Sequence, residues 1–77
     1  MRRVAPGFPE AVGLVRLTAR ERLVLQQLAV HETMADVAAE LTVSVNTIKK
    51  QTLSIYAKLG THERAAALAR AHDLGLL

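Results

Sequence analysis

The hydrophobic positions between residues 41 and 60 recur at helical spacing and fall on one side of a single helix. With about 100° of rotation per residue, this buried stripe, apolar except for Thr52, consists of Ile48, Thr52, Ile55 and Leu59. We call the opposite side the outer ridge; it contains no acid and consists of Asn46, Lys49, Lys50, Leu53 and Ala57. The pattern predicts a helix over about residues 45–59, with one side in the core and the other exposed.

Three further helices are predicted from hydrophobic spacing and from residues that start or end a helix. The four expected helices span about residues 19–30, 34–41, 45–59 and 63–74. Thr18 and Glu21 have the spacing of a capping box, in which each side chain accepts a hydrogen bond from the other residue's backbone N–H. Gly60 and Gly75 follow the last two helices, where glycine readily ends a helix. Since alanine and leucine dominate and aromatic residues are scarce, the domain is expected to be all-α.

The connection between the second and third helices is very short. Only Thr42, Val43 and Ser44 separate them, and a turn of this length makes two helices cross steeply. Ala38 is small enough to let the helices approach closely, and Val43 can fill the angle between them. We therefore expect a four-helix bundle that contains a helix-turn-helix: a supporting helix, a tight turn and a helix whose outer side is exposed.

The chain is long enough for one small domain with one modest core. Residues 1–16 hold both prolines and two of the four glycines and show no helical period, so they are expected to be a linker or tail. Residues 17–77 form the expected folded domain. The sequence has no apolar run long enough to span a bilayer, and its first residues lack the continuous apolar stretch of a signal peptide. The lack of cysteine fits a reducing compartment, and we expect a cytoplasmic protein.

The charges are distributed unevenly, although the net charge is only +3. The region of the second helix is acidic through Glu32, Asp36 and Glu40. The third helix carries no acid, and its cations are Lys49, Lys50 and Lys58. Cations gathered on one element indicate a nucleic-acid partner, and a narrow cationic helix face fits the major groove of DNA. On charge alone, an ordinary solvated surface explains the pattern equally well.

Three segments carry a resemblance to a known family. They are "LTARERLVLQQLA" (17–29), "DVAAELTVSVNTIKK" (36–50) and "IYAKLG" (55–60). Together they resemble the LuxR/GerE-type DNA-binding domain of bacterial transcription regulators, and the resemblance covers residues 17–77 without a gap. The last segment looks closest to the large MalT-like or LAL-type regulators, although response regulators share much of it. In such proteins this domain sits at the C-terminus, behind a sensor or ATPase part.

The resemblance implies sequence-specific binding to double-stranded DNA, with the helix over 45–59 as the recognition helix. By matching position, the residues at the base edges are Lys49, Lys50 and Leu53. For Leu53, a chance exposed apolar residue or a contact to a partner explains the pattern equally well. Those implied to contact phosphate are Ser44, Asn46 and Thr47, with Lys58 and Arg64 as flanking candidates. The free N–H groups and positive dipole end at the start of a helix favour a phosphate there independently of the family. Arg64 has a second interpretation, in which it caps the loop before the last helix.

The resemblance also implies that the last helix forms the contact of a homodimer. Its outer positions Ala65, Ala69 and His72 are spaced i, i+4 and i+7 and are small or semi-polar, so a second copy can approach closely. A two-fold pair would place two recognition helices about one DNA turn apart, on a two-half-site operator. Because this contact is small, the isolated domain is expected to be monomeric or weakly dimeric and to pair on DNA.

A protein-interaction module is the alternative function. The weak basicity of the second helix and an exposed Leu23 would suit docking to a partner domain or to RNA polymerase, and the steep salt dependence of DNA binding separates the two. An enzyme is not expected, because no catalytic constellation or glycine-rich phosphate loop is present. His31, His62 and His72 lack metal-ligand spacing, so neither a metal nor a cofactor is expected.

Several positions depart from the family pattern. His31 stands where glycine is usual, although histidine adopts the left-handed conformation less easily. On the second helix, Ala35, Ala39 and Glu40 stand where basic residues are usual. Thr52 stands where an aliphatic residue is usual, and we expect its hydroxyl to bond a backbone carbonyl one turn back. These departures bear on affinity and stability more than on the fold.

Overall fold

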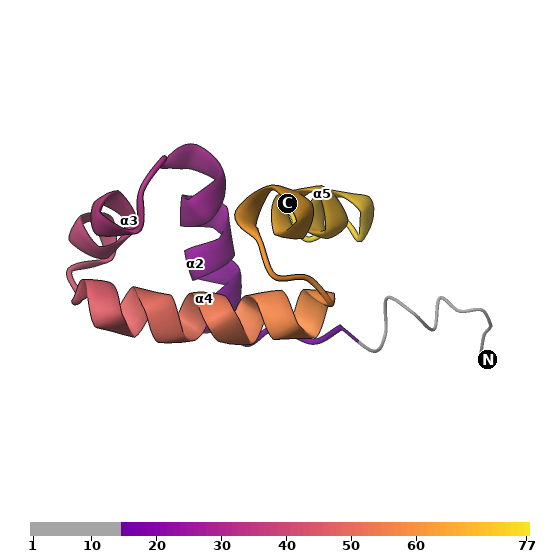
Figure 1. Ribbon diagram of the computed structural model, residues 1–77, viewed down its shortest axis with the longest axis horizontal. Coiled ribbons are helices and arrows are strands. Elements are labelled where there is room, and N and C mark those ends of the chain that lie inside the picture. Colours follow the sequence, from indigo (N-terminus) through magenta and orange to yellow (C-terminus); the bar gives the residue numbers. More distant parts are fainter. Residues whose placement is uncertain (1–14) are drawn as a thin grey trace.

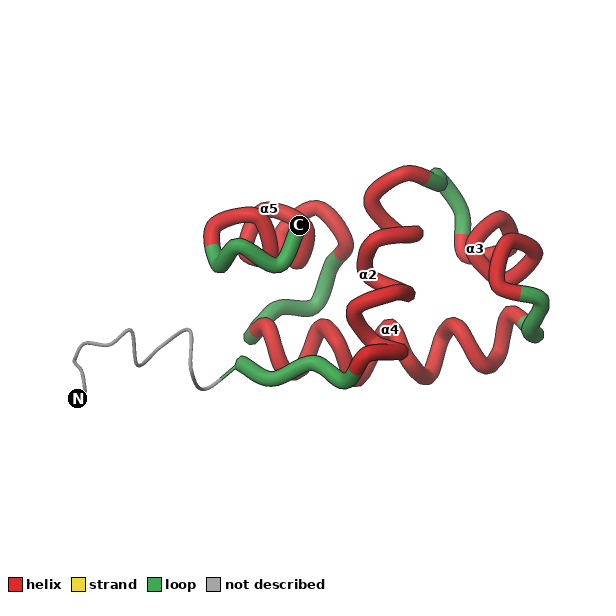
Figure 2. The backbone as a smooth tube through the Cα atoms, turned by 180° about the vertical axis from the view of Figure 1, so that it is seen from behind, coloured by secondary structure: helices red, strands yellow, loops and turns green. Residues whose placement is uncertain are grey.

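The computed structural model describes residues 15–77, which form four helices joined by short turns (Figures 1 and 2). The helices are α2 (Ala19–Val30), α3 (Met34–Leu41), α4 (Val45–Leu59) and α5 (Arg64–Asp73). No strand occurs within this part of the chain, so the all-α prediction is confirmed. The last helix is one residue shorter at each end than the expected 63–74. The predicted linker or tail, 1–16, lies outside the described residues except for its last two positions.

The longest helix, α4, runs along one edge of the domain, and the other helices lie above or behind it in the view of Figure 1. α3 lies near the N-terminal end of α4, α2 crosses its middle, and α5 lies near its C-terminal end (Figures 1 and 2). All three helices therefore pack against one side of α4. Within residues 15–77 no helix covers the opposite side, and this is the side on which the outer ridge is expected.

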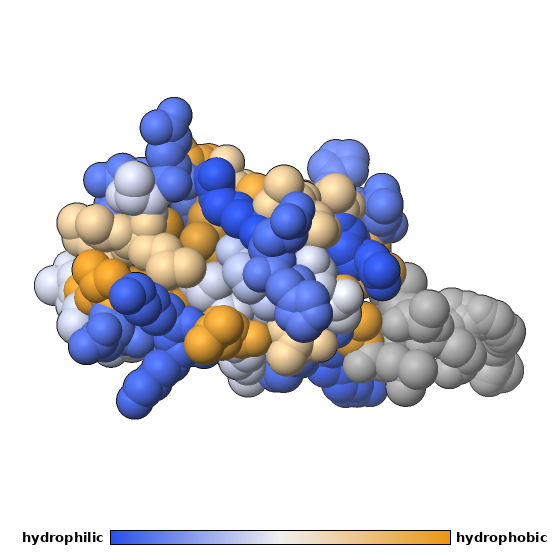
Figure 3. Space-filling model, viewed as in Figure 1, coloured by the Kyte–Doolittle hydropathy of each residue, from blue (hydrophilic) through white to orange (hydrophobic). Residues whose placement is uncertain are grey.

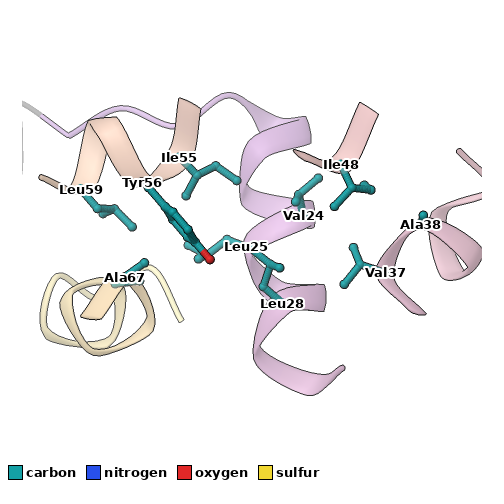
Figure 4. Packing of buried hydrophobic residues seen from close by; sticks show 11 residues of the cluster. Val24, Leu25, Leu28, Val37, Ala38, Ile48, Ile55, Tyr56, Leu59 and Ala67 are labelled. Carbon is teal, nitrogen blue, oxygen red and sulfur yellow. The ribbon is translucent and has the colours of Figure 1, made fainter. Parts of the chain in front are cut away.

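The core lies where the four helices meet (Figure 4). Its buried apolar residues are Val24, Leu25 and Leu28 from α2, Val37 and Ala38 from α3, Ile48, Ile55, Tyr56 and Leu59 from α4, and Ala67 and Ala71 from α5. Ile48 and Ile55 have 0% of their surface exposed and Leu59 has 2%, so the predicted stripe is buried. Burying side chains of this size stabilises the fold by roughly 1.5–3 kcal/mol each, which fixes the rotation of α4 about its own axis.

The turn between α3 and α4 is closed by backbone hydrogen bonds. Thr42 takes the left-handed conformation, with φ 58° and ψ 47°, and the N–H of Val43 donates to the carbonyl of Ala38 at 3.0 Å. Ser44 then caps α4 by accepting a hydrogen bond from the N–H of Thr47 at 3.1 Å. The side chain of Val43 packs against the core, as predicted. The chain thus reverses sharply, and Figure 1 shows α3 almost end-on beside α4 lengthwise.

The polar member of the buried stripe differs from expectation. Thr52 has 0% of its surface exposed, and its hydroxyl oxygen is buried without a hydrogen-bond partner. The prediction that this hydroxyl bonds a backbone carbonyl one turn back is therefore wrong. A β-branched side chain has few rotamers in a helix, so the packing of the stripe, rather than a hydrogen bond, sets the direction of this hydroxyl.

Replacing Thr52 by valine is expected to stabilise the domain. The variant keeps the β-branched shape and removes a buried hydroxyl that has no partner, which costs roughly 1 kcal/mol or more. For a domain of this size, each kcal/mol raises the melting temperature by about 4–8 °C. Thermal unfolding of Thr52→Val and of Thr52→Ser provides the test; the serine variant keeps the hydroxyl, loses the methyl group and should melt below wild type. A valine variant that melts below wild type would show that the hydroxyl makes a good hydrogen bond.

Candidate nucleic-acid interface

The outer ridge is open to solvent along its whole length. All of its members are exposed: Asn46, Lys49, Lys50, Leu53 and Ala57. Leu53 alone has 68% of its surface exposed. Figure 3, in the orientation of Figure 1, shows long hydrophilic side chains extending from the N-terminal half of α4 beside an exposed hydrophobic one. The two-sided helix expected from the sequence is thus present, with the stripe inside and the ridge outside.

The two lysines of the ridge are free of intramolecular ion pairs within residues 15–77. In this part of the chain Lys58 forms an ion pair with Glu21, and the ring of His31 lies 3.9 Å from the carboxylate of Glu40; neither contact involves Lys49 or Lys50. An ammonium group that has no partner within the fold remains available for an anionic or hydrogen-bonding partner outside it.

The N-terminal end of α4 brings three predicted site residues together. Ser44 and Thr47 form the cap, and their side-chain oxygens lie 3.0 Å apart; Asn46 lies between them in sequence and is exposed. The first N–H groups of a helix have no partner within it, and the helix dipole adds positive potential at this end. The free N–H groups can therefore donate to a phosphate oxygen while the hydrogen bond of the cap stays intact.

Lys58 is directed away from the ridge, toward α2. Its Nζ lies 2.7 Å from Oε1 of Glu21, and the hydroxyl of Ser54 donates to Oε2 of the same carboxylate at 2.7 Å. Glu21 also completes the capping box with Thr18, whose N–H donates to Oε1 at 2.9 Å. One carboxylate thus ties the start of α2 to the second half of α4. The capping box was predicted from the sequence, whereas the link to α4 was not.

The environment of Glu21 keeps it ionised. Glu21 is only 8% exposed, and burial by itself raises the pKa of a carboxyl group. The hydrogen bonds from Lys58, Thr18 and Ser54, together with the charge of Lys58, outweigh this and lower the pKa of Glu21 from 4.5 to about 2. The carboxylate is therefore a charged part of the scaffold that holds α4 against α2.

Arg64 closes the C-terminal end of α2. Its Nε and Nη2 donate to the carbonyl of Leu28 at 3.1 and 2.6 Å, and Nη2 also donates to the carbonyl of His31 at 2.6 Å. The sequence leaves two roles open for Arg64, contact with DNA phosphate or capping of the loop before the last helix. In the fold Arg64 does cap backbone carbonyls, but those at the end of α2. His31 is extended, with φ −111° and ψ 145°, so the chain needs no glycine here. No local pattern signals the link, since Arg64 and Leu28 are far apart in sequence.

The exposed surfaces of α5 and α3 differ in character. On α5, the predicted contact residues Ala65, Ala69 and His72 are all exposed, opposite the buried Ala67 and Ala71. α3 exposes Asp36 and Glu40, so this part of its surface repels a polyanion. A polyanion therefore meets attraction along α4 and repulsion at α3. None of the helices within residues 15–77 is long and apolar enough to cross a membrane.

A short helix, a tight turn and a longer helix with one buried and one exposed cationic side define a helix-turn-helix domain of the DNA-binding class. The family model for bacterial regulatory proteins of the luxR family matches residues 15–71, and the chain belongs to this family. It is a LuxR-type DNA-binding domain of a transcription regulator, as the resemblance in the sequence predicts.

Similar proteins carry the names of regulators. Over 61 residues the chain is 46% identical to the "Probable transcriptional regulatory protein NarL" of two strains of Mycobacterium tuberculosis. This alignment covers 79% of the chain and 28% of each relative. Over 56 residues it is 45% identical to the "Probable transcriptional regulatory protein SgaR" of Hyphomicrobium methylovorum, covering 73% of this chain and 26% of the relative. The chain thus spans little more than a quarter of these curated relatives. No solved structure matches it significantly. The finer resemblance to MalT-like regulators stays a prediction.

Proposed function

We propose that the domain binds double-stranded DNA sequence-specifically, in the cytoplasm, with the outer ridge of α4 in the major groove. One observation carries the proposal: opposite a buried stripe, α4 exposes no acid and two lysines, neither of which forms an ion pair within residues 15–77. A major groove admits one helix, and among the helices of residues 15–77 α4 is the one whose exposed side carries lysines and no acid. Because its inner side is packed in the core, α4 presents the ridge to DNA in a fixed orientation.

The proposed contacts divide into two groups. Lys49 and Lys50 contact base edges, where lysine donates to O6 and N7 of guanine. Ser44, Asn46 and Thr47 contact a phosphate at the start of α4, which sets the register of the helix but carries no sequence information. The direct contacts of Lys58 and Arg64 with phosphate stay predictions; in the fold, these two residues first of all bind Glu21 and the end of α2.

The salt dependence of binding tests the proposal. In a fluorescence anisotropy titration, log Kd should change linearly with log salt, by about 0.9 for each phosphate neutralised. A DNA site enriched from a random library should bind more tightly than its scrambled sequence at every salt concentration. Equal and weak affinity for both duplexes would contradict the proposal.

Docking to another protein is the competing function, because Leu23, on α2 rather than on α4, is 36% exposed. In that case Leu23→Asp abolishes binding to a partner domain or to RNA polymerase, while the domain shows no preference among duplexes. If the proposal holds, Leu23→Asp leaves the affinity for the enriched site unchanged.

We further propose that two copies pair through α5 on an operator with two half-sites. The exposed positions Ala65, Ala69 and His72 lie on one side of α5, and small side chains there let a second α5 approach. A two-fold pair reads a palindromic site, because the same residues of each copy meet the same bases.

Replacing Ala69 by glutamate is expected to abolish cooperative binding. The substitution puts a bulky charge into the proposed contact and repeats it in the partner copy. The melting temperature and the affinity for a single half-site should stay at the wild-type values, because Ala69 is exposed. Gel-shift titrations on one and on two half-sites test this, with Ala66→Glu, also exposed and on the same helix, as the matched control. Cooperative binding that survives Ala69→Glu would remove α5 from the dimer contact.

A further inference from the structure

Leu53 is a large apolar side chain in the middle of a polar surface. It is 68% exposed, and it belongs neither to the core nor to the partly buried residues packed against the core. Around the helix axis it lies between Lys49 and Lys50, about 40° from the first and about 60° from the second. A single exposed leucine needs no explanation elsewhere on a protein, but this one lies between the two side chains proposed to contact bases.

The chemistry of leucine restricts what it can recognise in the major groove. Its side chain neither donates nor accepts a hydrogen bond. The groove edges of guanine, adenine and cytosine carry donors and acceptors, which lose water without gaining a partner when leucine covers them. Thymine is the base that adds an apolar group, the methyl group on C5. Thymine is therefore the base that complements Leu53.

We infer that Leu53 packs against the C5 methyl group of a thymine in each half-site, within a few base pairs of the guanines contacted by Lys49 and Lys50. The inference rests on the proposed function and adds a base preference to it. The lysines supply attraction that falls with salt, whereas the leucine supplies a contact that salt hardly affects. Leu53 is thus a specificity-determining residue: it contributes discrimination between bases rather than charge.

Substitution of single thymines by uracil tests this contact, because uracil differs from thymine in the groove by the methyl group alone. The probe is the duplex enriched by the wild-type domain from a random library. Each thymine of one half-site is replaced in turn, and Kd is measured for wild type, Leu53→Ala and the control Leu23→Ala, which shortens an exposed leucine on α2. One position should weaken wild-type binding about fourfold, the value for one buried methyl group. The same position should weaken Leu23→Ala equally and Leu53→Ala not at all.

The possible results separate this inference from the function on which it rests. If a site is enriched but no uracil weakens binding, or if the loss persists in Leu53→Ala, Leu53 does not contact a methyl group and the inference is overturned, while sequence-specific binding stands. If no sequence is enriched, the proposed function and the inference fail together. A loss at one thymine that disappears in Leu53→Ala alone supports both.

Discussion

Replacing Glu21 by alanine is expected to destabilise the domain by about 2–3 kcal/mol and to lower its melting temperature by about 10 °C or more. The substitution removes one acceptor from three donors: the N–H of Thr18, the hydroxyl of Ser54 and the ammonium of Lys58. The loss is less than that of a fully buried ion pair, because the side chain of Lys58 is 38% exposed. The capping box and the link between α2 and α4 disappear together.

The same carboxylate makes stability depend on pH in a defined window. The pKa of Glu21 is about 2 in the folded domain, against 4.5 for an ordinary glutamate. A lowered pKa stabilises the folded state fully above about pH 4.5, and the contribution is lost as the pH falls from there toward 2. Melting temperatures of wild type and Glu21→Gln between pH 2 and 7 should therefore differ most near neutrality and converge in acid.

The matched control for this series is Glu63→Gln, because Glu63 is exposed and makes no side-chain cap hydrogen bond. Its melting temperature should follow that of wild type at every pH. A difference between wild type and Glu21→Gln that stays constant down to pH 2 would show that the charge of Glu21 is not what holds α4 to α2.

Replacing Lys49 or Lys50 by alanine is expected to weaken binding to the enriched site by about 1–3 kcal/mol each, a loss of about 5- to 150-fold. Both side chains are exposed, so the melting temperature should not change. Affinity for scrambled DNA should fall less, since a base contact contributes little where its base is absent. Arg70→Ala, which removes one exposed positive charge from α5, is the control for the general loss of charge.

The two kinds of result assign each lysine to a role. An equal loss on the enriched and the scrambled duplex would reassign that lysine to phosphate contact, which is independent of sequence. No loss on either duplex would place it outside the interface and would contradict the proposed orientation of α4.

The sequence predicts most of the fold because the decisive signals are local. The spacing of Ile48, Ile55 and Leu59 sets the buried side of α4, and the short connection between α3 and α4 sets their crossing. These features depend on helix periodicity and on turn length alone, so they can be recognised without coordinates.

The contacts that the sequence does not predict are long-range ones. Arg64 reaches the carbonyl of Leu28, and Lys58 reaches Glu21. The family resemblance makes both cations flanking candidates for DNA, and an intramolecular partner far away in sequence leaves no periodic signal that would point to the contacts within the fold. The hydroxyl of Thr52 is a further case, since its direction follows from packing that exists only in the folded core.

The most direct test of the account is an NMR titration of the isotope-labelled domain with the enriched duplex, followed through backbone and side-chain shifts. If the outer ridge lies in the major groove, the largest shift changes and the intermolecular contacts to base protons occur at Lys49, Lys50 and Leu53. The surface around Leu23 should stay unchanged. Contacts with DNA that centre on α3 or on the Leu23 surface, with the ridge of α4 unperturbed, would contradict the account.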